Sequence, residues 1–96
     1  MSFPNVTTIE SYAFVYCSHN SFKSVSFPEA TTIGRNAFEY CINLSNITAP
    51  KVTTIGSRAF MECYGLSSVS FPLLTSMDTY AFYRCNISTV SFSLIT

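Results

Sequence analysis

The stretch Ala37-Phe38-Glu39-Tyr40-Cys41 decides the fold, because it recurs at a nearly fixed spacing along the chain. The other copies are Ala13-Phe14-Val15-Tyr16-Cys17, Ala59-Phe60-Met61-Glu62-Cys63 and Ala81-Phe82-Tyr83-Arg84-Cys85. Alanine, phenylalanine and cysteine are constant, and successive copies start 24, 22 and 22 residues apart. A period of about 20–50 residues is typical of proteins built from stacked structural repeats. The pattern therefore predicts a stacked-repeat architecture.

Each repeat also carries a proline, and Pro4, Pro28, Pro50 and Pro72 all lie nine residues before the next Ala-Phe pair. The consensus unit reads Leu-x-x-Val-Ser-Phe-Pro-x-x-Thr-Thr-Ile-Gly-x-x-Ala-Phe-x-x-Cys. The alternating, β-branched Val-Ser-Phe segment predicts a short strand. Proline should end that strand because it has no N–H to donate. The Thr-Thr-Ile segment is again extended by propensity.

The segment after Thr-Thr-Ile predicts a turn followed by a short helix. Gly34 and Gly56 suit a sharp turn with positive φ, although other repeats have Glu10 or Asp78 at this place. Counted from Ile33, the residues Ala37, Phe38 and Cys41 lie at positions i+4, i+5 and i+8, which share one helical face. The helix would have about two turns and be partly 3₁₀.

About eight positions per repeat should point inward: Leu, Val and Phe of the strand, the residue before Thr-Thr, then Ile, Ala, Phe and Cys. One repeat cannot bury that face alone, so neighbouring repeats must cover it. We therefore expect an α/β right-handed solenoid with one parallel strand per repeat and short helical or 3₁₀ turns on the convex side. Residues 1–96 form a single domain of about four repeats, each 22–24 residues long.

Two further expectations follow from the repeat alignment. Glu29 and Lys51 occupy the same position in successive repeats, as do Glu62 and Arg84, so each pair should meet across the stack. The long spacer 18–21 after the first cysteine should bulge out as a loop, because insertions collect in loops.

The repeat resembles the BspA-like (Treponema-type) leucine-rich repeats over essentially the whole chain. Leu66-Ser-Ser-Val69-Ser-Phe71 fits the Leu-x-x-Leu-x-Leu strand pattern of leucine-rich repeats, although their usual asparagine is not at its place. The Phe-Pro, Thr-x-Ile-Gly and Ala-Phe-x-x-Cys segments carry the resemblance to the BspA-like type. Members of that family are mostly surface-exposed proteins associated with adhesion to host proteins and other cells. The resemblance implies an extracellular or cell-surface location.

The charge balance excludes several classes of partner. Charged residues make up 10% of the chain and the net charge is zero. Nothing therefore attracts the chain to nucleic acid or to an anionic membrane. No apolar run approaches the roughly 18 residues of a membrane span, so we expect no membrane insertion.

The cysteines and the single histidine do not predict a catalytic, metal or cofactor site. The four cysteines share one repeat position, which favours reduced, buried thiols in a ladder over disulfides or a tetrahedral zinc site. His19 lies in the expected loop without an obvious base-orienting partner, and no serine sits in a nucleophile-elbow pattern. We therefore expect a non-enzyme with no catalytic residues, metal or cofactor.

Two surfaces are candidate binding sites. Polar strand residues should form a concave face, here called the hydroxyl face, made of Ser24, Ser26, Asn46, Thr48, Ser68, Ser70, Thr89 and Ser91. Solenoids often bind along such surfaces, but short polar side chains also simply solvate a strand. A second surface, the tyrosine flank, contains Tyr12, Tyr16, Tyr40, Tyr80 and Tyr83. Its rings could bind a partner or a sugar, or could cover the ends of the core.

These observations favour a non-catalytic protein–protein interaction module, and the family resemblance implies that it is part of a cell-surface adhesin. A structural or self-assembling repeat protein and a glycan-binding module are the alternatives. Neither end of the chain carries a polar capping repeat, which predicts either a fragment of a longer array or homo-oligomers formed through repeat ends, and we favour the second. The candidate self-association end consists of Val90, Phe92, Leu94 and Ile95. The partner, whether a protein or a glycan, is not encoded by any motif.

Overall fold

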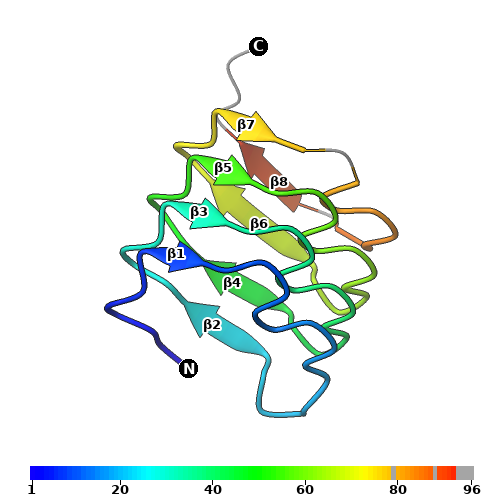
Figure 1. Cartoon of the computed structure of the whole chain (residues 1–96). Helices are drawn as coiled ribbons and strands as arrows, with labels where there is room; N and C mark the ends of the chain where they lie inside the picture. The colour runs from blue at the N-terminus through cyan, green and yellow to red at the C-terminus, as the bar shows by residue number, and fades with distance from the viewer. Residues whose placement is uncertain (79, 88, 93–96) are drawn as a thin grey trace.

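The computed structural model of the chain describes residues 1–78, 80–87 and 89–92. Each repeat forms one coil, and the coils stack so that each contributes a strand to each of two parallel sheets (Figure 1). The first sheet contains the Val-Ser-Phe segments in the order β2 (Ser24–Ser26), β4 (Asn46–Thr48), β6 (Ser68–Phe71) and β8 (Thr89–Phe92). The second contains β1 (Thr8–Ile9), β3 (Thr32–Ile33), β5 (Thr54–Ile55) and β7 (Ser76–Met77).

The strand register pairs equivalent repeat positions. Val25 lies opposite Ile47, and Val69 lies opposite Val90. The sequence predicts one sheet only, so the second sheet corrects that expectation. Its strands are the Thr-Thr-Ile segments, which are extended as predicted and pair because stacking brings the same side of each coil together.

The first threonine of each Thr-Thr pair links two coils through both its backbone and its side chain. The N–H and the Oγ1 hydroxyl of Thr53 both donate to the carbonyl of Thr31, at 2.9 and 3.3 Å. Thr75 donates in the same way to Thr53, at 2.9 and 3.1 Å. A hydroxyl at this position therefore adds a second hydrogen bond to each step of the ladder.

The prolines end the strands of the first sheet by starting β-turns. The N–H of Ala30 donates to the carbonyl of Phe27, and that of Val52 donates to Ala49. Pro28 is therefore the second residue of its turn, where its fixed φ is favourable. The structure confirms that proline closes the strand.

The segment from Gly34 to Cys41 is not a helix, and the described residues contain no helix at all. It is a chain of β-turns in which Ala37, Glu39 and Cys41 each donate their N–H to the carbonyl three residues earlier. The third residue of a turn can then have positive φ, and Asn36 has a φ of 56°. Non-glycine residues with positive φ recur at two places per repeat, namely Tyr12, Tyr16, Asn36, Tyr40, Arg58, Glu62, Tyr80 and Arg84.

The alternate N–H groups of the turn segment bond to the next coil, which they would not do in a helix. The N–H of Asn36 donates to Ser57 at 3.0 Å, that of Phe38 to Ala59 at 2.7 Å, and that of Tyr40 to Met61 at 2.8 Å. This third side of each coil is therefore also held by hydrogen bonds that run along the stack. A helix would satisfy these groups internally and leave neighbouring coils without bonds on that side.

Glycine occurs in the turn segment for its size and not for positive φ, which corrects the sequence expectation. None of the described glycines has positive φ. A Cβ on Gly34 would lie 2.5 Å from the backbone nitrogen of Ser11, and one on Gly56 would lie 2.7 Å from that of Arg35. Two coils therefore approach each other too closely at this point for a side chain.

The core runs along the stack and contains the eight predicted inward positions. Phe38 and Phe60 are fully buried, and their rings are parallel with centroids 5.1 Å apart. Phe60 also stacks on Phe82 at 5.0 Å, so the rings form a continuous ladder. The other buried positions pack around it, as for Leu44 and Ile55.

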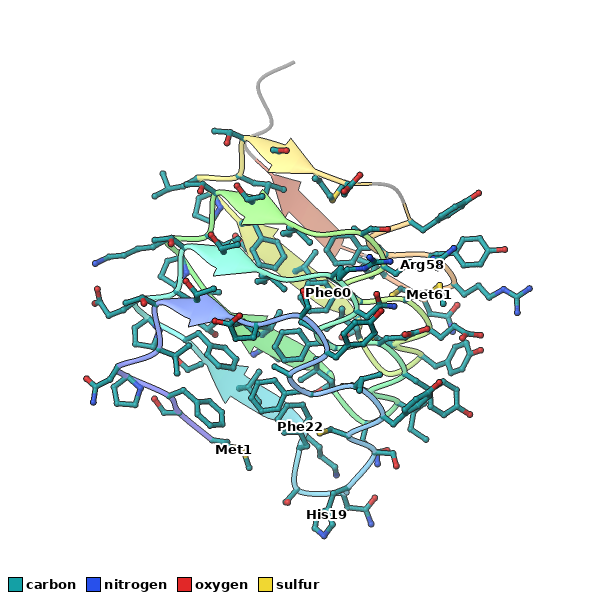
Figure 2. All side chains as sticks on the ribbon, viewed as in Figure 1. Met1, His19, Phe22, Arg58, Phe60 and Met61 are labelled. Atoms are coloured by element: carbon teal, nitrogen blue, oxygen red, sulfur yellow. The ribbon has the colours of Figure 1, made fainter. Side chains whose placement is uncertain are left out.

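The two predicted ion pairs and the predicted loop are present. Lys51 Nζ lies 2.8 Å from Glu29 Oε1, and Arg84 Nη1 lies 3.7 Å from Glu62 Oε2. Three of the four side chains are half exposed or more and that of Glu62 is 25% exposed, so water screens both pairs and they mainly report the correct alignment of the repeats. Residues 18–21 bulge from the N-terminal end of the stack, where His19 is labelled in Figure 2.

Replacing Phe60 with alanine is expected to cost about 3–5 kcal/mol of unfolding free energy, because the ring is buried between two others. Phe82→Ala is the matched control, since that ring is only partly buried and should cost clearly less. Chemical unfolding of both variants measures the difference. A Phe60→Ala loss below about 1 kcal/mol would contradict the ladder as the centre of the core.

Arg58→Asn is expected to stabilise the protein by roughly 1 kcal/mol, because Arg58 has a φ of 58° and asparagine tolerates that region better. Arg35→Asn is the control, because Arg35 has no positive φ. Thermal and chemical unfolding should show a gain for the first variant only. Equal effects in the two variants would show that the left-handed backbone is not strained.

Candidate binding surfaces and the thiol ladder

The predicted hydroxyl face lies on the outer side of the β2-β4-β6-β8 sheet. Ser24, Asn46, Thr48 and Ser70 are exposed, and Ser26 is half-buried. The register brings these residues together in rows that run across the strands, with Ser24 opposite Asn46 and Ser26 opposite Thr48. The backbone register continues the rows through Ser68, Thr89 and Ser91, whose side chains lie outside the described part of the structure.

The chemistry of this face is uniform. Its side chains are short, uncharged and able both to donate and to accept hydrogen bonds. The sheet backbone beneath them is paired from strand to strand, which holds the face in one conformation. A surface of this kind can dock a complementary surface closely but offers no acid, base or nucleophile activated for catalysis.

Most residues of the tyrosine flank leave the turn segments at the positions with positive φ. Tyr12, Tyr16 and Tyr80 are each more than half exposed, and Tyr40 is 39% exposed. The rings of Tyr16 and Tyr40 meet edge to face at 5.6 Å across neighbouring coils. These rings are largely on the surface, so they do not serve mainly as covers for the core.

Tyr64 extends this row, although the repeat alignment does not predict it. Its ring lies 6.3 Å from that of Tyr40, while Glu62 holds the position that corresponds to Tyr40. Tyr64 reaches back from two residues further along the chain and donates its hydroxyl to Glu62 Oε2 at 3.0 Å. That hydrogen bond raises the pKa of the Tyr64 hydroxyl.

Tyr80 and Tyr83 form a separate aromatic pair near the C-terminal end. Their rings meet at 5.0 Å with an interplanar angle of 70°. The guanidinium of Arg84 lies 5.4 Å from the centre of the Tyr83 ring, and a hydrogen bond with Tyr83 raises the pKa of Arg84. These two rings, together with Arg58 and Met61, line a hollow of about 330 Å³.

The cysteines form a ladder of free thiols, as the sequence predicts. The Sγ of Cys41 donates to the carbonyl of Phe14 at 3.0 Å, and that of Cys63 donates to Phe38 at 2.9 Å. Cys41 and Cys63 are buried, whereas the end members Cys17 and Cys85 are half-buried. The prediction of buried thiols is therefore confirmed fully only in the middle of the stack.

The surroundings of the central thiols keep them protonated. Burial raises the pKa of the Cys41 thiol to about 12. A hydrogen bond with Cys85, together with burial, raises the pKa of the Cys63 thiol as well. Because the thiolate is the reactive and metal-binding form, these two residues act as small core side chains.

The described residues form neither a group of metal-ligating side chains nor a helix that could span a membrane. Among the described residues, no three side chains of His, Cys, Asp or Glu are grouped as metal ligands would be. His19 Nδ1 lies 2.7 Å from Ser21 Oγ in the exposed loop, two residues along the chain from Cys17. The described segments include no helix long and apolar enough to span a bilayer.

The predicted self-association end cannot be placed in the same way. The backbone of Val90 and Phe92 belongs to β8, but their side chains lie outside the described part of the chain. Leu94 and Ile95 also lie outside the described residues. Association through this end remains a prediction.

Comparison with known proteins gives one match. The model of a family described as a BspA type leucine rich repeat region (6 copies) matches residues 1–96. Neither the curated proteins nor the solved structures provide a match to the chain. The family match covers the same residues as the repeat pattern and agrees with the stacked parallel strands.

The unfolding free energy is expected to fall as the pH rises above about 9, because Cys41 keeps its proton in the folded state up to about pH 12. In the unfolded chain the thiol has its ordinary pKa and ionises at a lower pH than in the folded protein. Ionisation therefore lowers the free energy of the unfolded state and reduces the free energy of unfolding. Below pH 9 the contribution is fully present. Urea unfolding of the wild type and of Cys41→Ala across this window measures the slope.

The wild type should lose stability more steeply with pH than Cys41→Ala, which lacks the titrating group. The other ionisable groups are present in both proteins, so their contributions cancel in the comparison. Identical slopes would show that the Cys41 thiol ionises in the folded protein as easily as in the unfolded chain.

Proposed function

The chain belongs to the BspA-type leucine-rich repeat family, and from this membership we propose that it is a non-catalytic protein-interaction module of a cell-surface adhesin. The observation that carries the proposal is the exposed hydroxyl face on the β2-β4-β6-β8 sheet. Members of the family are mostly surface-exposed or secreted, which supports the location.

The geometry of the hydroxyl face supports protein binding. Side chains such as Thr48 and Ser70 are exposed and short, so a partner can approach the strands closely. The two sheets and the turn segments bond each coil to its neighbours, so little conformational entropy is lost when the face is covered. Repeat proteins commonly use such extended surfaces for binding.

The distribution of reactive groups supports a non-catalytic role. His19 contacts Ser21, but this pair is exposed and no acidic side chain orients the imidazole among the described contacts. Nucleophilic catalysis needs a base that a third group holds in place. The central cysteines are buried and protonated, so they are poor nucleophiles.

A binding assay with two matched variants tests the proposal. Immobilised wild-type protein is presented with a panel of purified extracellular-matrix proteins, and Kd is measured by surface plasmon resonance. Thr48→Arg places a bulky charge in the middle of the hydroxyl face and should weaken binding at least about 10-fold. Thr54→Arg changes an equally exposed strand threonine on the other sheet and should leave Kd unchanged.

The outcome separates the hydroxyl face from other surfaces. Equal losses in both variants would contradict the assignment of this face. If the wild type binds no protein of the panel, the proposed adhesin role is contradicted. Circular dichroism of both variants confirms that any loss is not due to unfolding.

A further inference from the structure

We propose that the hollow lined by Arg58, Met61, Tyr80 and Tyr83 binds one acidic sugar residue, that is, a pyranose ring that carries a carboxylate. The hollow belongs to the turn segments, whereas the hydroxyl face lies on the β2-β4-β6-β8 sheet. Figure 2 shows Arg58 and Met61 together on this flank of the stack. The inference therefore does not depend on the protein-binding function.

Stacking of two coils creates the hollow. Arg58 and Tyr80 occupy equivalent positions 22 residues apart, and so do Met61 and Tyr83. The four side chains therefore lie at the corners of a space between neighbouring turn segments. In the preceding coil the same two positions hold Asn36 and Glu39, whose side chains bond to each other at 2.7 Å and leave Asn36 buried.

The aromatic walls suit the face of a sugar ring. Tyr80 and Tyr83 are 54% and 44% exposed, and their rings meet at an angle of 70°. A pyranose can place its C–H face on one ring and its edge against the other, while the phenol hydroxyls offer hydrogen bonds. A volume of about 330 Å³ is at the lower end of the usual range for small-molecule sites, which favours a ligand of single-ring size.

The charge of Arg58 selects an acidic sugar over a neutral one. Among the described residues Arg58 has no ion pair. Two acids of the turn segments have other partners, since Glu62 contacts Arg84 at 3.7 Å and Glu39 accepts from Asn36 at 2.7 Å. A guanidinium that is free in this way can bind a carboxylate through two parallel hydrogen bonds.

The backbone conformation sets the direction in which the side chains of Arg58 and Tyr80 leave the turn segments. Arg58 and Tyr80 have φ values of 58° and 60°, a conformation that costs most residues about 1–2 kcal/mol. Asn36 at the equivalent position tolerates it better. Because this conformation recurs in every repeat, it belongs to the stack as a whole, and only the side chains distinguish this hollow from the equivalent places in other coils.

An NMR titration of the ¹⁵N-labelled protein with sodium D-glucuronate tests the proposal. We expect saturable shifts of the amide signals of Met61, Tyr80 and Tyr83, with a Kd in the millimolar range. Methyl glucoside, which lacks the carboxylate, should bind at least about 10-fold more weakly. Acetate and the peptide Gly-Glu-Gly carry the carboxylate without the sugar ring and should also bind at least about 10-fold more weakly.

Two variants and a control assign the contacts. Arg58→Gln should weaken glucuronate binding at least about 10-fold and remove the preference over methyl glucoside. Tyr83→Leu should weaken both sugars, because the stacking surface is lost. Arg35→Gln removes an exposed arginine elsewhere on the turn segments and should leave the Kd unchanged.

Three results would overturn the proposal. One is the absence of saturable shifts at these amides with glucuronate. Another is binding of acetate or Gly-Glu-Gly as tight as that of glucuronate, which would indicate a simple carboxylate or peptide site. The third is an unchanged Kd in Arg58→Gln, provided that its amide spectrum remains folded. None of these results bears on binding at the hydroxyl face.

Discussion

Contact between neighbouring coils is the interaction on which every other feature of this structure depends. A single coil has short strands and an apolar side that it cannot cover alone. Phe60 is buried in large part because Phe38 and Phe82, from the neighbouring coils, stack on its two faces. The backbone follows the same principle, since both sheets and the turn segments form their hydrogen bonds from one coil to the next. Stability therefore resides in the interfaces between repeats more than in the repeats themselves.

The left-handed residues of the turn segment are a consequence of this constraint. With φ near 60°, Tyr40 and Glu62 direct their N–H groups to the neighbouring coil, at 2.8 and 2.7 Å. Because the backbone makes these bonds, the side chains at the same positions can vary without loss of the ladder. The chain uses this freedom to present tyrosine, arginine or glutamate on the flank, while the alanine, phenylalanine and cysteine of the core stay fixed.

The sequence periodicity predicts those contacts that form between equivalent positions of neighbouring repeats. It predicts the Val25–Ile47 register, the buried phenylalanines and the ion pair of Glu29 with Lys51. It does not predict the conformation of the turn segment, because the spacing of Ala37 and Cys41 suits a helix and a chain of β-turns alike. The choice is made by hydrogen bonds to another coil, which local spacing cannot reveal. Tyr64 is missed for a related reason, because it reaches Tyr40 from a position that is not equivalent.

Native-state hydrogen exchange tests the central claim most directly, because it reports the turn amides one by one. If contacts between coils hold the turn segment, the amides of Tyr40 and Phe38 should exchange as slowly as that of Ile47 in β4. The amide of Asn20 in the exposed loop serves as the fast reference. Exchange of the Tyr40 and Phe38 amides at the rate of Asn20, with Ile47 still protected, would contradict the account.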